Sequence, residues 1–334
     1  MSFRQRRRFT LAVRWGALGL LSGCTPEPPS KTDWGEGAGG ADTGAADNDP
    51  LTSASFAQIA SFNAEWLADH YTTTATERDD FQPRLAADYE MMRSLILAYD
   101  LDVIGLQEVE GDGAMELLGL PSRYAWVSGD TGWSQNLVIV YRSDRFTLEN
   151  VRQVRLPSNS GAARAPLVGE LRSRDGTLGF TLVVVHNNPY EDLNEARLRA
   201  RQVEELVDWL SDELPDTAAD DLADQVIVLG DFNDSFEGIN PSVPSLGPLE
   251  QRAGLQMASR NTTGFSYISF QSLIDHIALS PTLVERWTDR DDPEGFHPIA
   301  HDELEPWSSY TDGYRGVPNI SDHRPVWVQL ETGA

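Results

Sequence analysis

The sequence VIVLGDFN at residues 226–233 sets four apolar residues before a glycine, followed by the polar residues Asp231 and Asn233. A short, uninterrupted apolar run of this kind is typical of a strand that is covered on both faces. Gly230 permits a tight exit from the strand, because glycine has no side chain. The stretch therefore predicts a buried strand that delivers Asp231 and Asn233 at its downstream end.

The same order, an apolar run with polar side chains beside its end, recurs along the chain. These groups are Asn63 and Glu65 after residues 58–62, Gln107 and Glu108 after 103–106, His186, Asn187 and Asn188 after 183–185, Asp275 and His276 within 273–279, and Asp322 and His323 before 326–330. Strands of a common sheet can bring such ends together. We therefore expect these side chains to converge on one cleft.

Helix-like segments alternate with the predicted strands. Apolar residues recur at helical spacing over 81–99, and Asp192 to Glu195 has the form of a capping box before a second helix that reaches Leu214. A further apolar run at 137–141 suits another buried strand. Two loop-rich stretches, at about 234–270 and about 285–320, are expected to form the rim of a site.

The charge of the chain is uneven. Lys and Arg total 26 against 52 Asp and Glu, a net charge of −26, and residues 55–334 hold 20 Arg, 46 acidic residues and no Lys. Such an acidic body repels polyanions at long range, which disfavours avid, sequence-independent binding to DNA and suits cation binding. No apolar stretch is long enough to predict a membrane-spanning helix.

The first 24 residues have the pattern of an export signal. A basic segment at 4–8 precedes the apolar stretch 10–21, and Leu21 to Cys24 resembles the bacterial lipobox, whose cysteine is acylated. Cys24 is the only cysteine of the chain, although a leader that ends near a chance cysteine is the alternative. Export by the general or by the twin-arginine route stays open. Residues 25–54 are predicted to be a flexible tether, and 55–334 the folded domain.

The chemistry of the polar groups points to phosphate esters. Carboxylate and amide oxygens without thiolates favour Mg²⁺, with Mn²⁺ or Ca²⁺ as alternatives, over zinc. Histidines close to carboxylates are candidates for general acid and base. Phosphoester hydrolysis needs a cation, hydrogen-bond donors and such a pair. Taken singly, each motif also suits an ordinary turn, helix cap or structural histidine.

Six stretches together resemble the successive motifs of the endonuclease/exonuclease/phosphatase superfamily, which includes deoxyribonucleases and exonuclease III. They are Ser61 to Leu67, Ile104 to Val109, Val184 to His186, Val228 to Asn233, Ile274 to Ile277 and Ser321 to Pro325. The resemblance covers about 55–332. It implies a four-layer α/β/β/α sandwich of two mixed sheets.

The resemblance also implies roles for individual residues. Metal ligands would be Asn63, Glu108 and Asp322, and catalytic residues would be His186, Asp231, Asn233, Asp275 and His323. Asp275 would orient His323, which acts as base or as a phosphate-stabilising group. Asp231 and Asn233 would position the nucleophile and the phosphate. Which group takes the proton from water stays open.

The chain departs from the family pattern at three places. Asn187, Asn188 and Pro189 follow His186 where relatives often carry a lysine, so Asn187 is expected to bind substrate as a neutral donor. Gln135 or Asn136 stands where a glutamate partner of His186 is found in deoxyribonucleases. We therefore expect His186 to be less readily protonated. Arg164, in a turn with one proline lost, is either structural or a substrate contact.

The acidic loop that contains His297, His301, Asp302 and Glu303 offers a second set of metal-capable side chains. Such a loop could hold an extra cation, but a solvated rim loop is the simpler interpretation.

The sequence thus predicts a divalent-metal-dependent phosphoesterase acting on phosphodiester or phosphomonoester bonds, such as an extracytoplasmic nuclease. Its substrate would be a nucleic acid, a nucleotide or a lipid headgroup. Alternatives are a phospholipid or sphingomyelin phosphodiesterase, and a catalytically silent lipoprotein that binds phosphate ligands. We expect a monomer that is held to a membrane by its N-terminal lipid, in the periplasm or at the cell surface.

Overall fold

Two six-stranded mixed sheets form the framework in the computed structural model, which describes residues 55–67, 86–130, 135–159, 165–290, 295–309 and 320–333. In order, the first sheet contains β11 (His297–Pro298), β12 (Val326–Glu331), β1 (Phe56–Leu67), β2 (Val103–Val109), β4 (Asn136–Arg142) and β3 (Tyr124–Ser128). The second contains β5 (Phe146–Gln153), β6 (Leu167–Ser173), β7 (Gly179–His186), β8 (Val226–Asp231), β10 (Asp275–Leu279) and β9 (Gln256–Met257). Strands β1 and β2 are parallel, as are β7 and β8.

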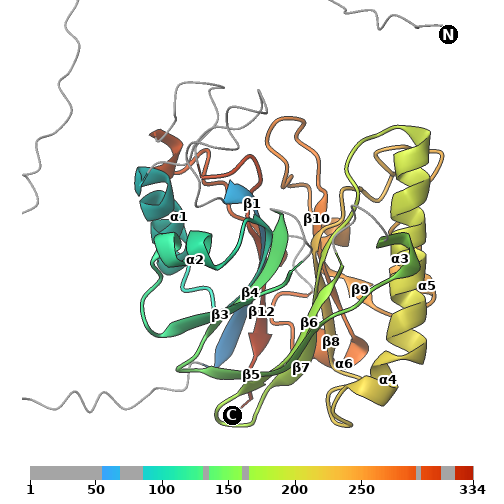
Figure 1. Cartoon of the computed structure of the whole chain (residues 1–334), viewed down its shortest axis with the longest axis horizontal. Helices are drawn as coiled ribbons and strands as arrows, with labels where there is room; N and C mark the ends of the chain where they lie inside the picture. Colours follow the sequence, from blue (N-terminus) through green and yellow to red (C-terminus); the bar gives the residue numbers. More distant parts are fainter. Residues whose placement is uncertain are drawn as a thin grey trace, which may run out of the picture. The chain divides into compact units, whose positions relative to one another are not determined.

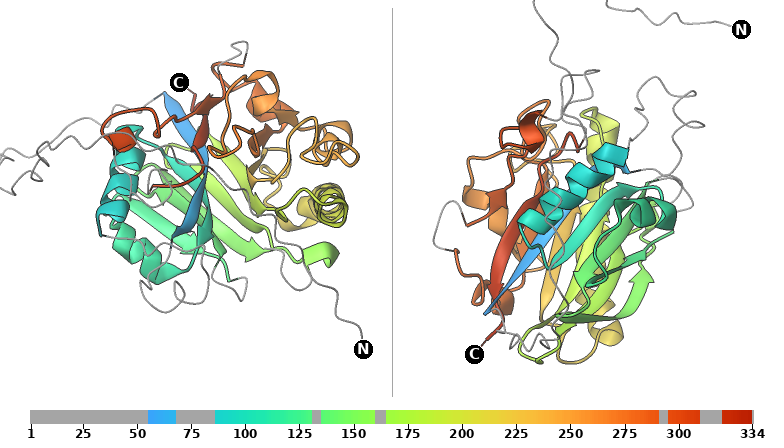
Figure 2. Two further views of the ribbon diagram at one scale, coloured as in Figure 1. Left: turned by 90° about the horizontal axis from the view of Figure 1, so that it is seen from above. Right: turned by 90° about the vertical axis from the view of Figure 1, so that its left-hand side faces the viewer.

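Helices cover the outer face of each sheet (Figures 1 and 2). The longer helices are α1 (Ala86–Ala98), α2 (Asp112–Leu118) and α3 (Leu193–Asp212), and the short ones are α4 (Leu214–Thr217), α5 (Gly247–Gln251) and α6 (Pro281–Val284). Three 3₁₀ turns lie at η1 (Pro157–Asn159), η2 (Ala258–Asn261) and η3 (Trp307–Ser309). Helices α1 and α2 lie beside the first sheet and α3 beside the second, which confirms the four-layer sandwich.

Alternation along the strands fills three separate cores. Ile227 and Leu229 of β8 pack between the sheets, whereas Val228 packs against α3. In the same way, Val103 of β2 faces the other sheet and Ile104 faces α1. Because side chains on a strand point to opposite faces in turn, a continuous apolar run is needed where both faces are covered. This is why the central strands could be recognised in the sequence.

The predicted elements and the observed ones agree in type. The strands expected at 58–62, 103–106, 137–141, 183–185, 226–229, 273–279 and 326–330 correspond to β1, β2, β4, β7, β8, β10 and β12. The capping box is present, since the Asp192 side chain accepts hydrogen bonds from the backbone of Asn194 and Glu195 at the start of α3. The sequence did not predict β3, β5, β6 or α2.

The signal and tether expected over residues 1–54 lie outside the described residues. Leu51–Ala334 forms one compact unit. Among the helices that the structure describes, none combines the length and the apolar character needed to cross a bilayer.

Gly230 lets β7 and β8 approach closely just before the polar end of β8. Its φ is 151°, and a Cβ added there would lie 2.0 Å from the carbonyl oxygen of Val185. The two strands pair Val185 with Gly230 and His186 with Asp231. The glycine therefore permits the close approach of the two strands where His186 lies beside Asp231.

We expect Gly230→Ala to lower the free energy of unfolding by about 3 kcal/mol, because the methyl group meets backbone that cannot move without breaking the sheet. Urea unfolding monitored by circular dichroism measures the change. Gly247→Ala is the matched control, because an added Cβ there comes no closer than 3.4 Å to the flexible Gln251 side chain. Equal stability of the two variants would contradict this account of the β7–β8 approach.

Candidate active site

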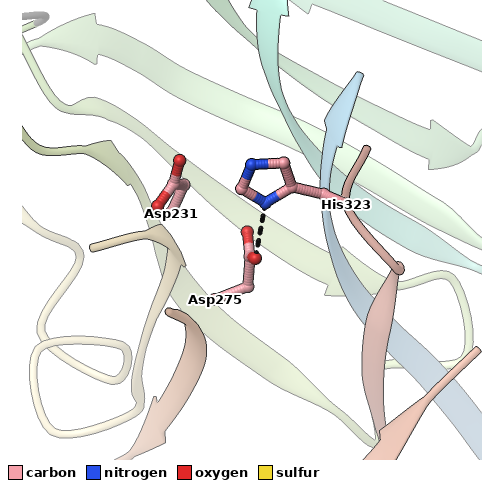
Figure 3. A group of neighbouring side chains, drawn as sticks. All are labelled: Asp231, Asp275 and His323. Atoms are coloured by element: carbon pink, nitrogen blue, oxygen red, sulfur yellow. Dashed lines mark hydrogen bonds and ion pairs between the residues drawn. The ribbon is translucent and has the colours of Figure 1, made fainter. Parts of the chain in front are cut away.

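Strand register brings the predicted side chains to one end of the two sheets. The parallel pairs place Asn63 of β1 beside Gln107 of β2, and His186 of β7 beside Asp231 of β8. The antiparallel pair β8 and β10 sets Asp275 opposite Asp231. Figure 3 shows Asp231, Asp275 and His323 facing one another, although they lie far apart in the sequence. The expected convergence is confirmed for these residues. It is wrong for His276, which points to the other face of the sheet and is buried between Phe232 and Phe236, and for Gln107, which donates to Ser61 and to the Gly105 carbonyl oxygen.

The backbone at the ends of β1 and β2 is irregular. The register shifts between Asn63 and Leu67, and Glu65 and Glu108 have positive φ angles of 43° and 61°. A non-glycine residue is rarely held in this region, and such positions cluster at functional sites. The bulge ends regular pairing where the site begins.

Asn63 joins the two sheets at the site. Its Nδ2 donates to Oδ2 of Asp231 at 3.0 Å and lies 3.4 Å from Oε1 of Glu108. Nε2 of His186 lies 3.5 Å from the same Glu108 oxygen and 3.4 Å from Oδ2 of Asp231. The carboxylates of β2 and β8 thus meet around one amide and one imidazole.

Asn233 holds the Asp231 carboxylate from the other side. Its backbone N donates to Oδ1 at 2.8 Å, and its Nδ2 donates to Oδ2 at 3.0 Å and to the carbonyl oxygen of Asn187 at 3.1 Å. Burial raises the pKa of Asp231 to about 7; the negative charge of Asp275 adds to the rise, and His323 and the hydrogen-bond donors oppose it. A bound cation would favour the ionised form.

His323 and Asp275 form a buried imidazole–carboxylate pair (Figure 3). Nδ1 of His323 lies 2.7 Å from Oδ2 of Asp275. Burial lowers the pKa of His323, but the charge and hydrogen bond of Asp275 outweigh it, helped by Asp322 and Asp231, so the pKa lies well above its ordinary value. Nδ1 is therefore a donor to Asp275. Nε2 lies 3.8 Å from Oδ1 of Asp322.

Hydroxyl groups fix the segments that carry this pair. Ser321 donates to the carbonyl oxygen of Asn63 at 2.6 Å and accepts from the backbone N of His323 at 2.9 Å. Ser266 accepts from the backbone N of Asp275 at 3.0 Å. Glu65 accepts from the backbone N of Asp322 at 2.9 Å. Ser266 belongs to no motif recognised in the sequence, whereas Ser321 and Glu65 lie inside such motifs.

The loop after His186 is tied to one face of α3. Gln202 accepts from the backbone N of Asn188 at 3.0 Å, and Glu195 accepts from the Asn188 amide. The fully buried Arg199 donates to the carbonyl oxygens of Asn188, at 3.2 Å, and of Tyr190. Sequence reasoning missed Arg199, because an arginine on a helix is usually solvated.

The donor set fits a hard cation. Four carboxylates belong to this region, those of Glu108, Asp231, Asp275 and Asp322, together with the Asn63 amide. Single ligand atoms of Asp231, Asp275 and His323 lie within 4.8 Å of one another. Because Asp275 is already hydrogen-bonded to His323, the Glu108 carboxylate and the Asn63 amide are the oxygen donors that a cation could use beside this pair.

The remaining residues that the sequence singled out lie outside the cluster around Asp231 or outside the described residues. Arg164 and Cys24 lie outside the described residues. Asn136 donates to the carbonyl oxygen of Glu110 at 2.8 Å. The solvated-rim interpretation is wrong for His301, which is fully buried with Nε2 3.2 Å from the carbonyl oxygen of Ser321.

The acidic residues of the same loop pair with an arginine. Asp302 accepts two hydrogen bonds from Arg324, at 2.7 and 2.8 Å, and Glu303 accepts a third. These carboxylates therefore neutralise Arg324, which explains their presence without an extra cation.

Solved structures share the fold at low identity. An endonuclease/exonuclease/phosphatase family protein from Bacteroides thetaiotaomicron is 18% identical, with 82% of this chain and 94% of that chain covered and a TM-score of 0.57. D. rerio TDP2 complexed with a single-strand DNA product is 17% identical (83% and 99% covered, TM-score 0.56). The mannosyl-6-phosphatase Bt3783 of B. thetaiotaomicron VPI-5482 is 19% identical (81% and 98% covered, TM-score 0.53).

A search of curated proteins found no match. The sequence model described as Endonuclease/Exonuclease/phosphatase family matches residues 60–323, which is most of the chain and includes every site residue described above from Asn63 to His323. The site within that span joins buried carboxylates, amides and two histidines, the groups that phosphoester hydrolysis needs. The chain therefore belongs to the Endonuclease/Exonuclease/phosphatase family and is a hydrolase of phosphoester bonds.

Proposed function

We propose that the protein is a Mg²⁺-dependent phosphoesterase that cleaves small or single-stranded phosphodiesters and phosphomonoesters outside the cytoplasm. The observation that carries the proposal is the meeting of Glu108, Asp231 and Asn63 beside the Asp275–His323 pair. When bound, the cation would neutralise charge that develops on the phosphoryl oxygens. Asn63 and Glu108 would hold it, with Asp322 on the side of His323.

Proton transfer divides between the two sides of the site. Asp231, which Asn63 and Asn233 hold in place at the end of β8, takes the proton of the attacking water. His323 is charged at neutral pH, so its Nε2–H donates to the phosphate or to the leaving oxygen. Asp275 keeps Nδ1 protonated and fixes the ring. His186, Asn187 and Asn233 supply further donors for phosphate oxygens.

The substrate class follows from the charge of the body and from the similar structures. An acidic domain without lysine repels long polyanions, so duplex DNA is a poor substrate. Of the structures with the same fold, one is a complex of TDP2 with a single-strand DNA product and another is a mannosyl-6-phosphatase. Lipid headgroups are the second candidate, favoured by the lipobox at Cys24. A silent phosphate-binding protein is the third.

The proposal is tested with the full chain on bis-p-nitrophenyl phosphate, single-stranded DNA, plasmid DNA and sphingomyelin, each with Mg²⁺, Mn²⁺ or EDTA. We expect turnover of the first two in Mg²⁺ or Mn²⁺ and none in EDTA. Glu108→Gln and His323→Ala each lower kcat at least about 100-fold, because they remove a cation ligand and a proton donor.

Two matched variants control for the substitutions themselves. Glu116→Gln makes the same change at an exposed position of α2, and His297→Ala removes a histidine that stacks on Trp327. Both are expected to keep wild-type rates. Binding of phosphate ligands without turnover of any ester would instead support the silent binding protein.

The charge of His323 gives a pH prediction for the metal-free protein. Because its pKa is raised in the folded state, the contribution of His323 to the free energy of unfolding is fully present below pH 6.5. That contribution is lost as the pH rises through the folded pKa.

Asp275→Asn should lower the pKa of His323, because the largest attractive partner loses its charge. Two-dimensional NMR of the imidazole protons measures it, and an unchanged pKa would exclude Asp275 as the controlling partner.

The place of the protein in the cell is also part of the proposal. The lipobox supports acylation of Cys24 and anchoring of a monomer to a membrane, in the periplasm or at the cell surface, by the tether 25–54. Cys24→Ala should move the protein from the membrane fraction to the soluble fraction, and light scattering of that variant should give a monomer mass. Unchanged partitioning would mean that something other than this acyl chain holds the protein.

A further inference from the structure

Three rings lie in a row beside the Asp275–His323 pair. The Tyr267 ring centroid lies 4.9 Å from that of His323, and the Phe270 centroid lies 5.7 Å from that of Tyr267. Phe270 is 78% exposed, while His323 is buried. This aromatic row (His323, Tyr267 and Phe270) thus leads from the site to solvent. Single exposed aromatic residues are common, but this one continues a row that starts at the proton donor.

A tight hairpin holds Phe270 in place. The backbone N of Tyr267 donates to the carbonyl oxygen of Ser272 at 2.9 Å, and Gln271 has a positive φ of 50° next to Phe270. The hairpin is bonded to the segment that carries His323, because the N of Ile268 donates to the carbonyl oxygen of Asp322 at 2.9 Å. The exposed ring is therefore positioned relative to the imidazole. Figure 1 shows the chain looping above β10 before it enters that strand.

The arginines adjoining the site are already engaged. Arg324, next to His323, is bonded to Asp302 and Glu303 and lies over the Phe265 ring, with 3.8 Å from Cζ to the centroid. Arg199 is buried under the loop after His186. Among the residues that the structure describes, the segments next to His323 and His186 therefore offer neutral contacts for the part of a substrate beyond its phosphate. Stacking of a substrate ring on an aromatic side chain is such a contact, and it does not require positively charged residues nearby.

We propose that Phe270, backed by Tyr267, is a specificity-determining residue that stacks on the nucleobase of a nucleoside phosphoester whose phosphate lies at His323. This inference rests on the proposed function and narrows it to nucleotides and unpaired ends of nucleic acid, since bases inside a duplex are stacked on each other. Two aromatic rings in a row suit a planar base better than a lipid chain.

The test uses two esters that release the same p-nitrophenol, thymidine 5′-(p-nitrophenyl phosphate) and methyl p-nitrophenyl phosphate. In the full chain, Phe270→Ala should raise KM for the thymidine ester about 10-fold and for the methyl ester less than about 2-fold, with kcat unchanged for both. Phe270→Trp should keep or lower KM for the thymidine ester. Phe56→Ala removes another partly exposed ring, at the far end of β1 from Asn63, and should change neither KM.

Two outcomes overturn the inference. One is an equal rise of KM for both esters, which would show that the ring does not contact the base. The other is an unchanged KM together with loss of binding to phosphatidylcholine vesicles, which would make Phe270 a lipid contact.

A binding measurement separates this inference from the proposed function. If the wild type cleaves neither ester, the proposed function fails, but stacking is still decided by the fluorescence difference between Phe270→Trp and the wild type. Thymidine 5′-monophosphate should quench the added tryptophan, and 2-deoxyribose 5-phosphate should not. Equal quenching by both, or by neither, overturns the stacking role.

Discussion

The buried carboxylate of Asp231 is the constraint on which the site depends. A carboxyl group removed from water keeps its charge only if donors or a cation replace the lost solvation. Here Asn233 and Asn63 donate to both of its oxygens, and Asn63 belongs to the opposite sheet. The interaction therefore links the two sheets as well as the two halves of the sequence. The raised pKa of Asp231 indicates that the donors alone do not fully offset burial next to Asp275.

The excess of negative charge that the hydrogen-bond donors leave uncompensated explains why a cation suits the site. Glu108 and Asp231 each approach Nε2 of His186, and Asp275 and Asp322 both lie close to His323. One imidazolium does not neutralise four carboxylates, and Arg324 is bound elsewhere by Asp302 and Glu303. A divalent ion would lower the mutual repulsion and leave Asp275 free to hold His323. The acid–base pair and the cation ligands are thus separate groups that share one electrostatic environment.

Much of the framework could be predicted because a strand that is buried on both faces needs an uninterrupted run of apolar residues, which is visible in the sequence. Strands β2, β7 and β8 each contain a run of apolar residues with motif residues at or near its end, so both their type and their polar ends could be recognised. Strand β5 could not, because its edge position leaves Glu149 and Asn150 in solvent and its pattern polar. Positioning groups such as Ser266 and Arg199 were also missed. Their roles arise from contacts with distant backbone, which composition and spacing do not encode.

The acidic body changes how such a site can recognise substrate. In enzymes that bind nucleic acid through arginine and lysine, affinity comes largely from phosphate contacts and is spread along the strand. In this chain Asn187 and Asn188 replace the expected lysine, and Arg199 is buried where it supports their loop instead of facing the site. Neutral amides and exposed rings give short-range contacts that weaken little with salt. In the described part of the chain, such contacts would concentrate affinity on one phosphate and on the group attached to it, which favours small substrates over long polyanions.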